Sequence, residues 1–227
     1  MKIVKMLSFS LMLAAVLSAG CATAKKNLSY SPDWGDVTRI NRPVVGVLLP
    51  VSDQRANTRV YPKQIIIRTN HGGYKSYDIN DRPVDEVFGE AFSAEIEKMG
   101  VKLIHPADME GPLDKESAEG MKKALNAKYP DAGVAFGVNI KEFVATSQRK
   151  LFRDQVKITA DIELYTLDLG TGDIGSSEFT TEWVDALYSA DHNYMVEQLD
   201  KALANLVLKG VRDNMTMRDM LVKIANR

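Results

Sequence analysis

The chain is poor in the residues that support several common chemistries. It holds 1 Cys and 3 His among 227 residues. A single Cys cannot form an internal disulfide, and a zinc site would have to rely mainly on carboxylates. The formal net charge of −1 argues against the broad basic surface that nonspecific nucleic-acid binding requires. We therefore expect no metal, no cofactor and no nucleic-acid partner.

The overall composition is that of a folded domain. Hydrophobic residues make up 45% of the chain and charged residues 26%, with 7% aromatic. These values exclude disordered, collagenous and coiled-coil classes. The two ends of the chain are considered separately from this domain.

The N-terminus has the pattern of a secretory signal peptide. Lys2 and Lys5 form a basic start, and residues 6–17 are an apolar run broken only by two Ser. As a helix this run spans about 18 Å, against roughly 30 Å for the hydrocarbon core of a bilayer. The segment is therefore too short for a transmembrane anchor, and residues 1–20 are predicted to be removed as a signal.

The residues at the end of that signal, Leu17-Ser18-Ala19-Gly20-Cys21, resemble the lipobox of bacterial lipoproteins. In that family the chain is cleaved before the Cys, which corresponds to the bond between Gly20 and Cys21, and the Cys receives acyl chains such as palmitate. Several acyl chains anchor a protein to a membrane almost irreversibly. Ala22 rather than Asp at the next position implies, by the same resemblance, the outer membrane. The alternative is a plain signal peptide that leaves Cys21 as a free thiol.

The remainder of the chain divides into a tether and one domain. Residues 21–42 show no hydrophobic period and are predicted to be a lipidated N-terminus and flexible tether. Residues 43–227 contain no second linker and no internal repeat, and are predicted to be a single periplasmic domain.

Hydrophobic periodicity predicts an α+β fold: a mixed, mostly antiparallel sheet with helices packed mainly on one face. The expected strands lie at 44–49, 61–68, 74–79, 101–104, 134–145 with a bulge before residue 143, 156–164 and 176–184. The expected helices are 83–99, a weaker one capped by Asp114 and ending near 128, one that starts after an Asp191 N-cap, and a last one with Thr216 and Asp219 as a capping box.

Candidate catalytic groups are few and scattered. His71, His105 and His192 fall in a hairpin turn, at a strand end and at a helix start, with no partner at metal-ligand spacing. Asp161 and Glu163 share one strand face, but a solvated sheet face neutralised in part by Lys157 explains them better than a catalytic pair. We therefore expect a protein that is not an enzyme.

One loop motif remains open. Asp53 and Arg55 stand two residues apart just beyond the first strand. They could form a structural ion pair or face a partner.

The order of these segments resembles the YajG-type bacterial lipoproteins. The resemblance rests on the lipobox, the VGVLLPVSDQR segment at 45–55, the helix leading into 98–101, the VKITADIELYTLD strand at 156–168 and the terminal helix with 217–220. It implies an outer-membrane lipoprotein, and it carries over no catalytic residue.

Three functions follow as hypotheses. The first is a non-catalytic envelope lipoprotein, an adaptor or accessory that binds a periplasmic or envelope partner, with the edge of the 61–79 hairpin as the candidate docking element. The second is an envelope hydrolase acting on cell-wall or lipid material. The third is a subunit of an outer-membrane secretion or pore assembly.

Overall fold

A computed structural model of the chain describes eight stretches. They are residues 27–30, 39–55, 64–70, 73–78, 82–109, 112–150, 152–187 and 191–227. The predictions for Gly20, Cys21 and His71 lie outside the described residues.

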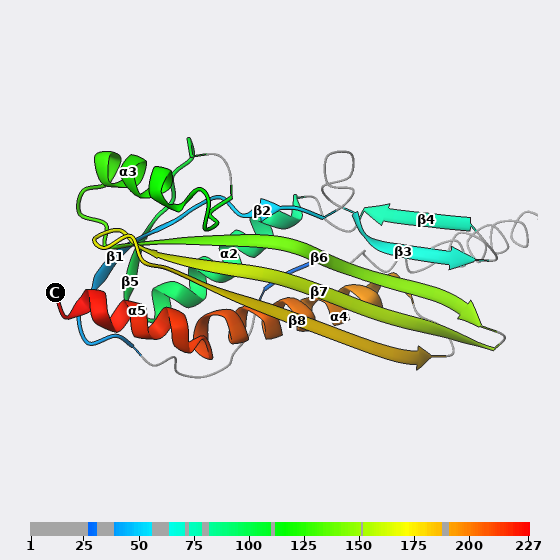
Figure 1. Ribbon diagram of the computed structural model, residues 1–227. Coiled ribbons are helices and arrows are strands. Elements are labelled where there is room, and N and C mark those ends of the chain that lie inside the picture. The colour runs from blue at the N-terminus through cyan, green and yellow to red at the C-terminus, as the bar shows by residue number, and fades with distance from the viewer. Residues whose placement is uncertain are drawn as a thin grey trace, which may run out of the picture.

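The eight-stranded sheet is organised by one long strand, β6 (Val134–Lys150). Along one edge of β6, three short strands pair with it in succession, all parallel: β1 (Val44–Leu48), β2 (Ser52–Asp53) and β3 (Gln64–Asn70). The three short strands fit on one edge because each pairs with a different part of β6. This arrangement joins the two ends of the molecule into one sheet (Figure 1).

Two further strands extend this side of the sheet. β5 (Val101–Ile104) pairs in parallel with β1. β4 (Gly73–Asp78) pairs antiparallel with β3, so the hairpin expected over 61–79 is confirmed for the strand pairing of the described residues 64–70 and 73–78.

The other edge of β6 carries a long antiparallel ribbon. β7 (Arg153–Asp168) pairs with β6 along its whole length, and β8 (Ile174–Leu187) pairs with β7. The turn between them uses Gly172 at φ +87°, a conformation that glycine adopts without strain. The predicted bulge is present between Ile140 and Glu142 of β6.

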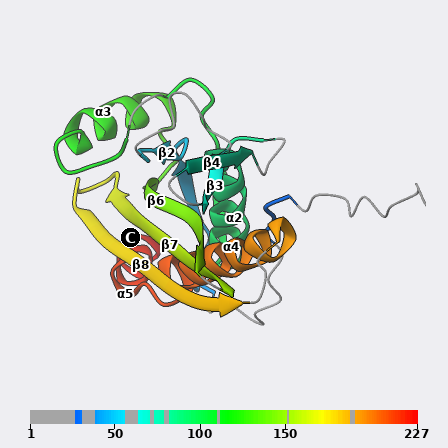
Figure 2. The same ribbon diagram turned by 90° about the vertical axis from the view of Figure 1, so that its right-hand side faces the viewer.

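Helices cover mainly one face of the sheet, so the predicted α+β fold is confirmed. The helical elements on this face are α2 (Val84–Lys98), α4 (His192–Val207), the π-helical turn η1 (Leu208–Arg212) and α5 (Met215–Ala225). Their apolar residues share one buried cluster with the inward side chains of β6 and β7, in which Phe88 and Phe143 meet edge to face at 4.9 Å. Of the described helices, α3 (Ala118–Lys128) lies on the opposite side of the sheet, as Figures 1 and 2 show. There Leu125 joins a second, smaller cluster with Leu113 and Leu167.

The predicted helix caps are confirmed in part. Gly100 follows α2 at φ +95°, and the Asp191 carboxylate accepts from the Tyr194 amide at 2.7 Å, as expected. The Asp114 cap was predicted wrongly. Its carboxylate accepts from the Ser117 amide at 2.7 Å and closes a turn, and α3 begins only at Ala118.

The start of α5 also differs from the prediction. Asn214 caps it, accepting from the Met217 amide at 3.1 Å, while Thr216 and Asp219 lie inside the helix. The short amide of Asn214 reaches the third residue onward, as N-cap side chains do.

Part of the segment expected to be a tether packs on the domain. Leu28 is 3% exposed and belongs to the main core. The Ser29 amide donates to Asp200 of α4 at 2.8 Å, and the Tyr30 hydroxyl lies near the carboxylate of Glu95 in α2. Burial, followed by this contact, raises the pKa of Tyr30 above its ordinary value. Residues 27–30 therefore lie against α2 and α4.

The C-terminal residue is also fixed in place. The Arg227 guanidinium donates to both carboxylate oxygens of Asp168, at 2.8 and 2.7 Å. Asp168 further accepts from the Gly170 and Thr171 amides at 2.9 and 3.1 Å. One buried carboxylate thus joins the β7–β8 turn to the end of α5.

Candidate functional site

A pocket lies where the parallel strands β1 and β5 end. The chain leaves β1 through residues 48–51 and leaves β5 through His105 and Pro106. The first turns of α2 close the third side with Asp85, Glu86 and Gly89. The cavity measures about 180 Å³, and its walls are mainly apolar. In sheets with parallel strands, this carboxyl edge is where ligands commonly bind.

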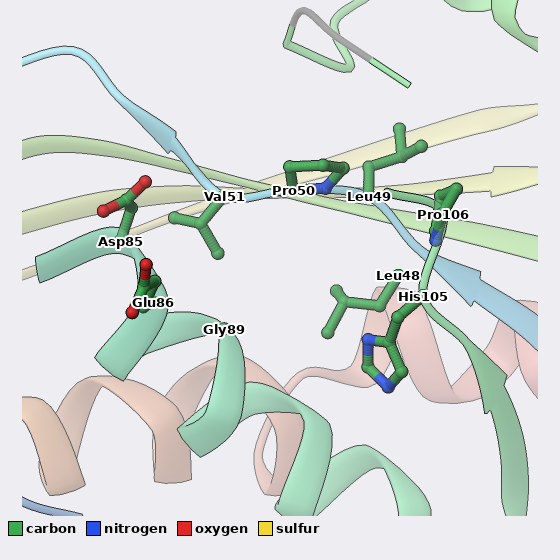
Figure 3. A pocket seen from close by; sticks show the side chains of 9 residues that line it. All are labelled: Leu48, Leu49, Pro50, Val51, Asp85, Glu86, Gly89, His105 and Pro106. Carbon is green, nitrogen blue, oxygen red and sulfur yellow. The ribbon is translucent and has the colours of Figure 1, made fainter. Parts of the chain in front are cut away.

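The polar groups of this pocket do not converge. Figure 3 shows Asp85 and Glu86 at one end and His105 at the other. The Nε2 atom of His105 lies 3.3 Å from the Ser93 hydroxyl, a contact within hydrogen-bonding distance. General acid and base catalysis needs groups that reach one reacting atom. The pocket can hold a small apolar ligand, and its separated groups do not form a catalytic pair.

Asp53 and Arg55 form a closely matched ion pair. The guanidinium Nε and Nη2 donate to the two carboxylate oxygens at 2.8 and 2.6 Å, and each side chain is 10% exposed. Arg55 also reaches the Phe143 carbonyl at 3.4 Å. The pair therefore ties the residues after β2 to the middle of β6, which is the geometry of a structural clamp.

The open face of the β6–β8 ribbon carries a polar cluster. Asp161 and Glu163 of β7 lie beside Glu178 of β8 and Lys141 of β6. The Lys141 ammonium lies 3.2 Å from Glu163 and 3.4 Å from Glu178. Lys157, the expected neutralising residue, instead pairs with Glu182 at 3.1 Å. The sequence could not assign Lys141 because its contact depends on which strands are neighbours.

Asp161 and Glu163 of β7 have different surroundings. Burial, followed by the nearby Glu178 charge, raises the pKa of Asp161. Its Oδ1 atom is enclosed and has no hydrogen-bond partner among the described residues. Burial, followed by the neighbouring Glu163, raises the pKa of Tyr165 to about 12. The face is therefore only partly solvated, and Asp161 is its unsatisfied member.

Two structural tests concern metals and membranes. Across the stretches that the structure describes, no three His, Cys, Asp or Glu side chains gather as metal ligands would. Within the same stretches, every helix is too short or too polar to cross a bilayer.

Comparisons with known proteins show the fold but no family. No protein-family model and no curated protein matches the chain. A solved structure of a Xanthomonas campestris protein of family DUF330 is similar, with a TM-score of 0.53, 10% identity, and coverage of 87% of this chain and 95% of that one. At this identity the similarity shows a shared fold and not a shared function.

Two other solved structures are similar over much of the chain. One is a homolog of the neuraminyllactose-binding hemagglutinin from Helicobacter pylori, with a TM-score of 0.42, 11% identity, and coverage of 86% of this chain and 98% of that one. The other is lipoprotein GNA1162 from Neisseria meningitidis, with a TM-score of 0.36, 9% identity, and coverage of 74% and 99%. TM-scores in this range do not establish a common fold.

Proposed function

We propose that the protein is a non-catalytic envelope lipoprotein, anchored through Cys21 to the outer membrane and facing the periplasm, where it binds a protein partner. One observation carries the anchor. The only Cys of the chain stands directly after a short apolar run, at the position where lipid attachment requires it. The YajG-like order of segments agrees with this function.

The docked residues 27–30 limit how far the domain can stand from the membrane. Seven residues lead from Cys21 to Leu28, which is buried in the core. An extended chain of that length spans at most about 25 Å. If Cys21 carries the lipid, the domain stays close to the bilayer, where other anchored or wall-bound proteins are within reach.

The pocket supports a non-catalytic function. The His105 imidazole lies within hydrogen-bonding distance of the Ser93 hydroxyl. The carboxylates of Asp85 and Glu86 lie at the other end of the cavity. Hydrolysis by a Ser–His pair also needs a third group that orients the imidazole. Binding without chemistry is what this arrangement favours.

Metabolic labelling tests the anchor. Cells that express the full chain are grown with labelled palmitate, with and without globomycin, which blocks lipoprotein signal cleavage. Wild type should take up label and should accumulate a longer precursor with the drug, whereas Cys21→Ser should take up no label. Ala22→Ser, next to the thiol, is the matched control and should label like wild type. Absence of label on wild type would refute the lipid anchor.

A further inference from the structure

The outer edge of β8 is open for pairing. β7 occupies one side of this 14-residue strand, and no described strand pairs with the other. Figure 2 shows β8 running along the outside of the ribbon. On an unpaired edge, every second residue directs its backbone N–H and C=O groups away from the sheet, ready to bond with another extended chain.

The charges of β8 all have one sign. The strand contains Glu178, Glu182 and Asp185 and no Lys or Arg. Glu178 and Glu182 lie on the open face of the ribbon, opposite Glu163 and Thr159 of β7. Lys141 and Lys157 neutralise them in part from strands further in.

Among the described residues, neither of these lysines forms an ion pair with Asp161. It stands opposite Thr180, a small side chain in the middle of β8. Lys141 is engaged by Glu163 and Glu178, and the Oδ1 atom of Asp161 has no donor within the described chain. A carboxylate oxygen that is enclosed without a hydrogen-bond donor destabilises the folded protein. A cation beside that carboxylate would reduce this destabilisation.

The helix-facing side of β8 offers an apolar contact. Trp183 is 38% exposed and borders a groove of about 330 Å³ between the ribbon and α4. Ile158 and Ala202 contribute to its walls. An extended chain beside β8 would place alternate side chains on this face, where one can cover Trp183.

We propose that the free edge of β8 binds an extended segment of a partner protein as an added strand. A Lys or Arg of that segment, opposite Thr180, pairs with Asp161, and an apolar side chain three residues along the segment, opposite Trp183, packs on the indole. The distance is feasible, because Lys141 already crosses one strand in the same way, from β6 over β7 to Glu178. The partner sequence is therefore one that alternates basic and apolar residues.

Charge argues against a second copy of this chain as the occupant. Two β8 strands paired antiparallel about a two-fold axis at Thr180, the register that covers Asp161, would bring Glu178 of one copy opposite Glu182 of the other. Neither strand carries a cation that could offset this contact. Like charges directly opposite in a sheet are destabilising, whereas a basic segment is attracted.

The inference rests on the partner-binding half of the proposed function and not on the lipid anchor. A fluorescein-labelled decapeptide of alternating Lys and Val is the probe, and its binding to the full-length protein in nonionic detergent is followed by fluorescence anisotropy. The peptide should bind, and a Glu–Val decapeptide should bind at least tenfold more weakly. Asp161→Asn should weaken binding by roughly tenfold, while Glu119→Gln, an exposed carboxylate on α3, should change nothing.

Backbone methylation distinguishes strand addition from simple charge attraction. The Lys–Val peptide is made with N-methyl groups on alternate residues, in both phases. Strand addition predicts that one phase binds and the other does not, because only one set of N–H groups faces β8. Equal affinity of the two phases, or equal loss, overturns the proposal.

Sedimentation tests the competing occupant. A dimer that Thr180→Lys dissociates would show that a second copy covers this edge and would overturn the proposal. The proposal is supported if the wild type is a monomer that binds the peptide and the Thr180→Lys variant does not bind it. Palmitate labelling does not involve β8, so failure here leaves the anchor to be judged separately.

Discussion

The carboxylate of Asp168 provides a test of how the β7–β8 turn is joined to the C-terminal residue. Its side chain is 2% exposed and accepts four hydrogen bonds, two of them from Arg227. Asp168→Asn preserves the shape but removes the charge and one pair of acceptor lone pairs. Hydrogen bonds to charged groups contribute roughly 1.5–3 kcal/mol each, less where one partner is solvated. Because Arg227 is 45% exposed, we expect a loss of about 2 kcal/mol for the variant.

The pKa of Asp168 determines how the stability difference between wild type and Asp168→Asn depends on pH. Burial alone would raise the pKa of Asp168, but the hydrogen bonds from Arg227, Thr171 and Gly170 outweigh it and lower the pKa. A carboxyl whose folded pKa lies below the unfolded value stabilises the protein above the unfolded pKa, roughly 4, and loses that contribution as the pH falls through the folded pKa. The difference between wild type and Asp168→Asn should therefore be largest near neutral pH and should disappear in acid.

Urea denaturation of the purified protein at neutral and acidic pH measures both effects. At neutral pH, thermal melting should fall by roughly 4–8 °C for a domain of this size. Asp173→Asn is the matched control, because it removes the same charge from an exposed position in the same turn. The reasoning is refuted if the two variants lose equal stability, or if the loss at Asp168 is the same at both pH values.

Two further predictions concern packing. Gly137→Ala would place a Cβ atom 2.5 Å from the Leu113 Cβ and should cost about 1–3 kcal/mol in urea denaturation. Gly120→Ala on α3 meets no atom within 4 Å and should stabilise by about 0.5–1 kcal/mol, so equal effects of the two would contradict the packing. Leu28→Ala removes the buried anchor of residues 27–30 and should cost about 2 kcal/mol while speeding chymotryptic cleavage after Tyr30. Ser29→Ala leaves the Ser29 amide donor in place and should be cleaved like wild type.

Local patterns identified most of the elements correctly. The 3.6-residue period and the closing Gly100 place α2 within a residue or two of its observed ends. The change of phase along β6 revealed the bulge, because the alternation of a strand must shift where one residue is inserted. Asp191 was found because a cap acts on a residue only three positions away.

The errors arose where several local solutions compete. Asn214 and Thr216 are both good N-caps, and the capping-box spacing favoured Thr216. The structure uses Asn214, which also accepts from Ser177 of β8 at 3.3 Å. Asp114 is likewise a good cap, but it closes a turn ahead of α3. At Asn214, a contact with a distant strand bears on the choice between two caps, whereas at Asp114 the competing turn is itself local.

The sequence by itself determined the composition class, the alternation of buried and exposed side chains, the approximate position of most elements and the lipobox-like position of Cys21. These depend on residues a few positions apart, and short-range geometry limits them to few outcomes. The long strands β6, β7 and β8 extend several residues beyond their predicted ends. Only the tertiary structure decided that β1, β2 and β3 share one edge of β6, that Leu28 enters the core, and that Lys141 rather than Lys157 serves Glu163. Those outcomes depend on which strands become neighbours, and that is selected by the burial of the whole apolar surface rather than by any local pattern.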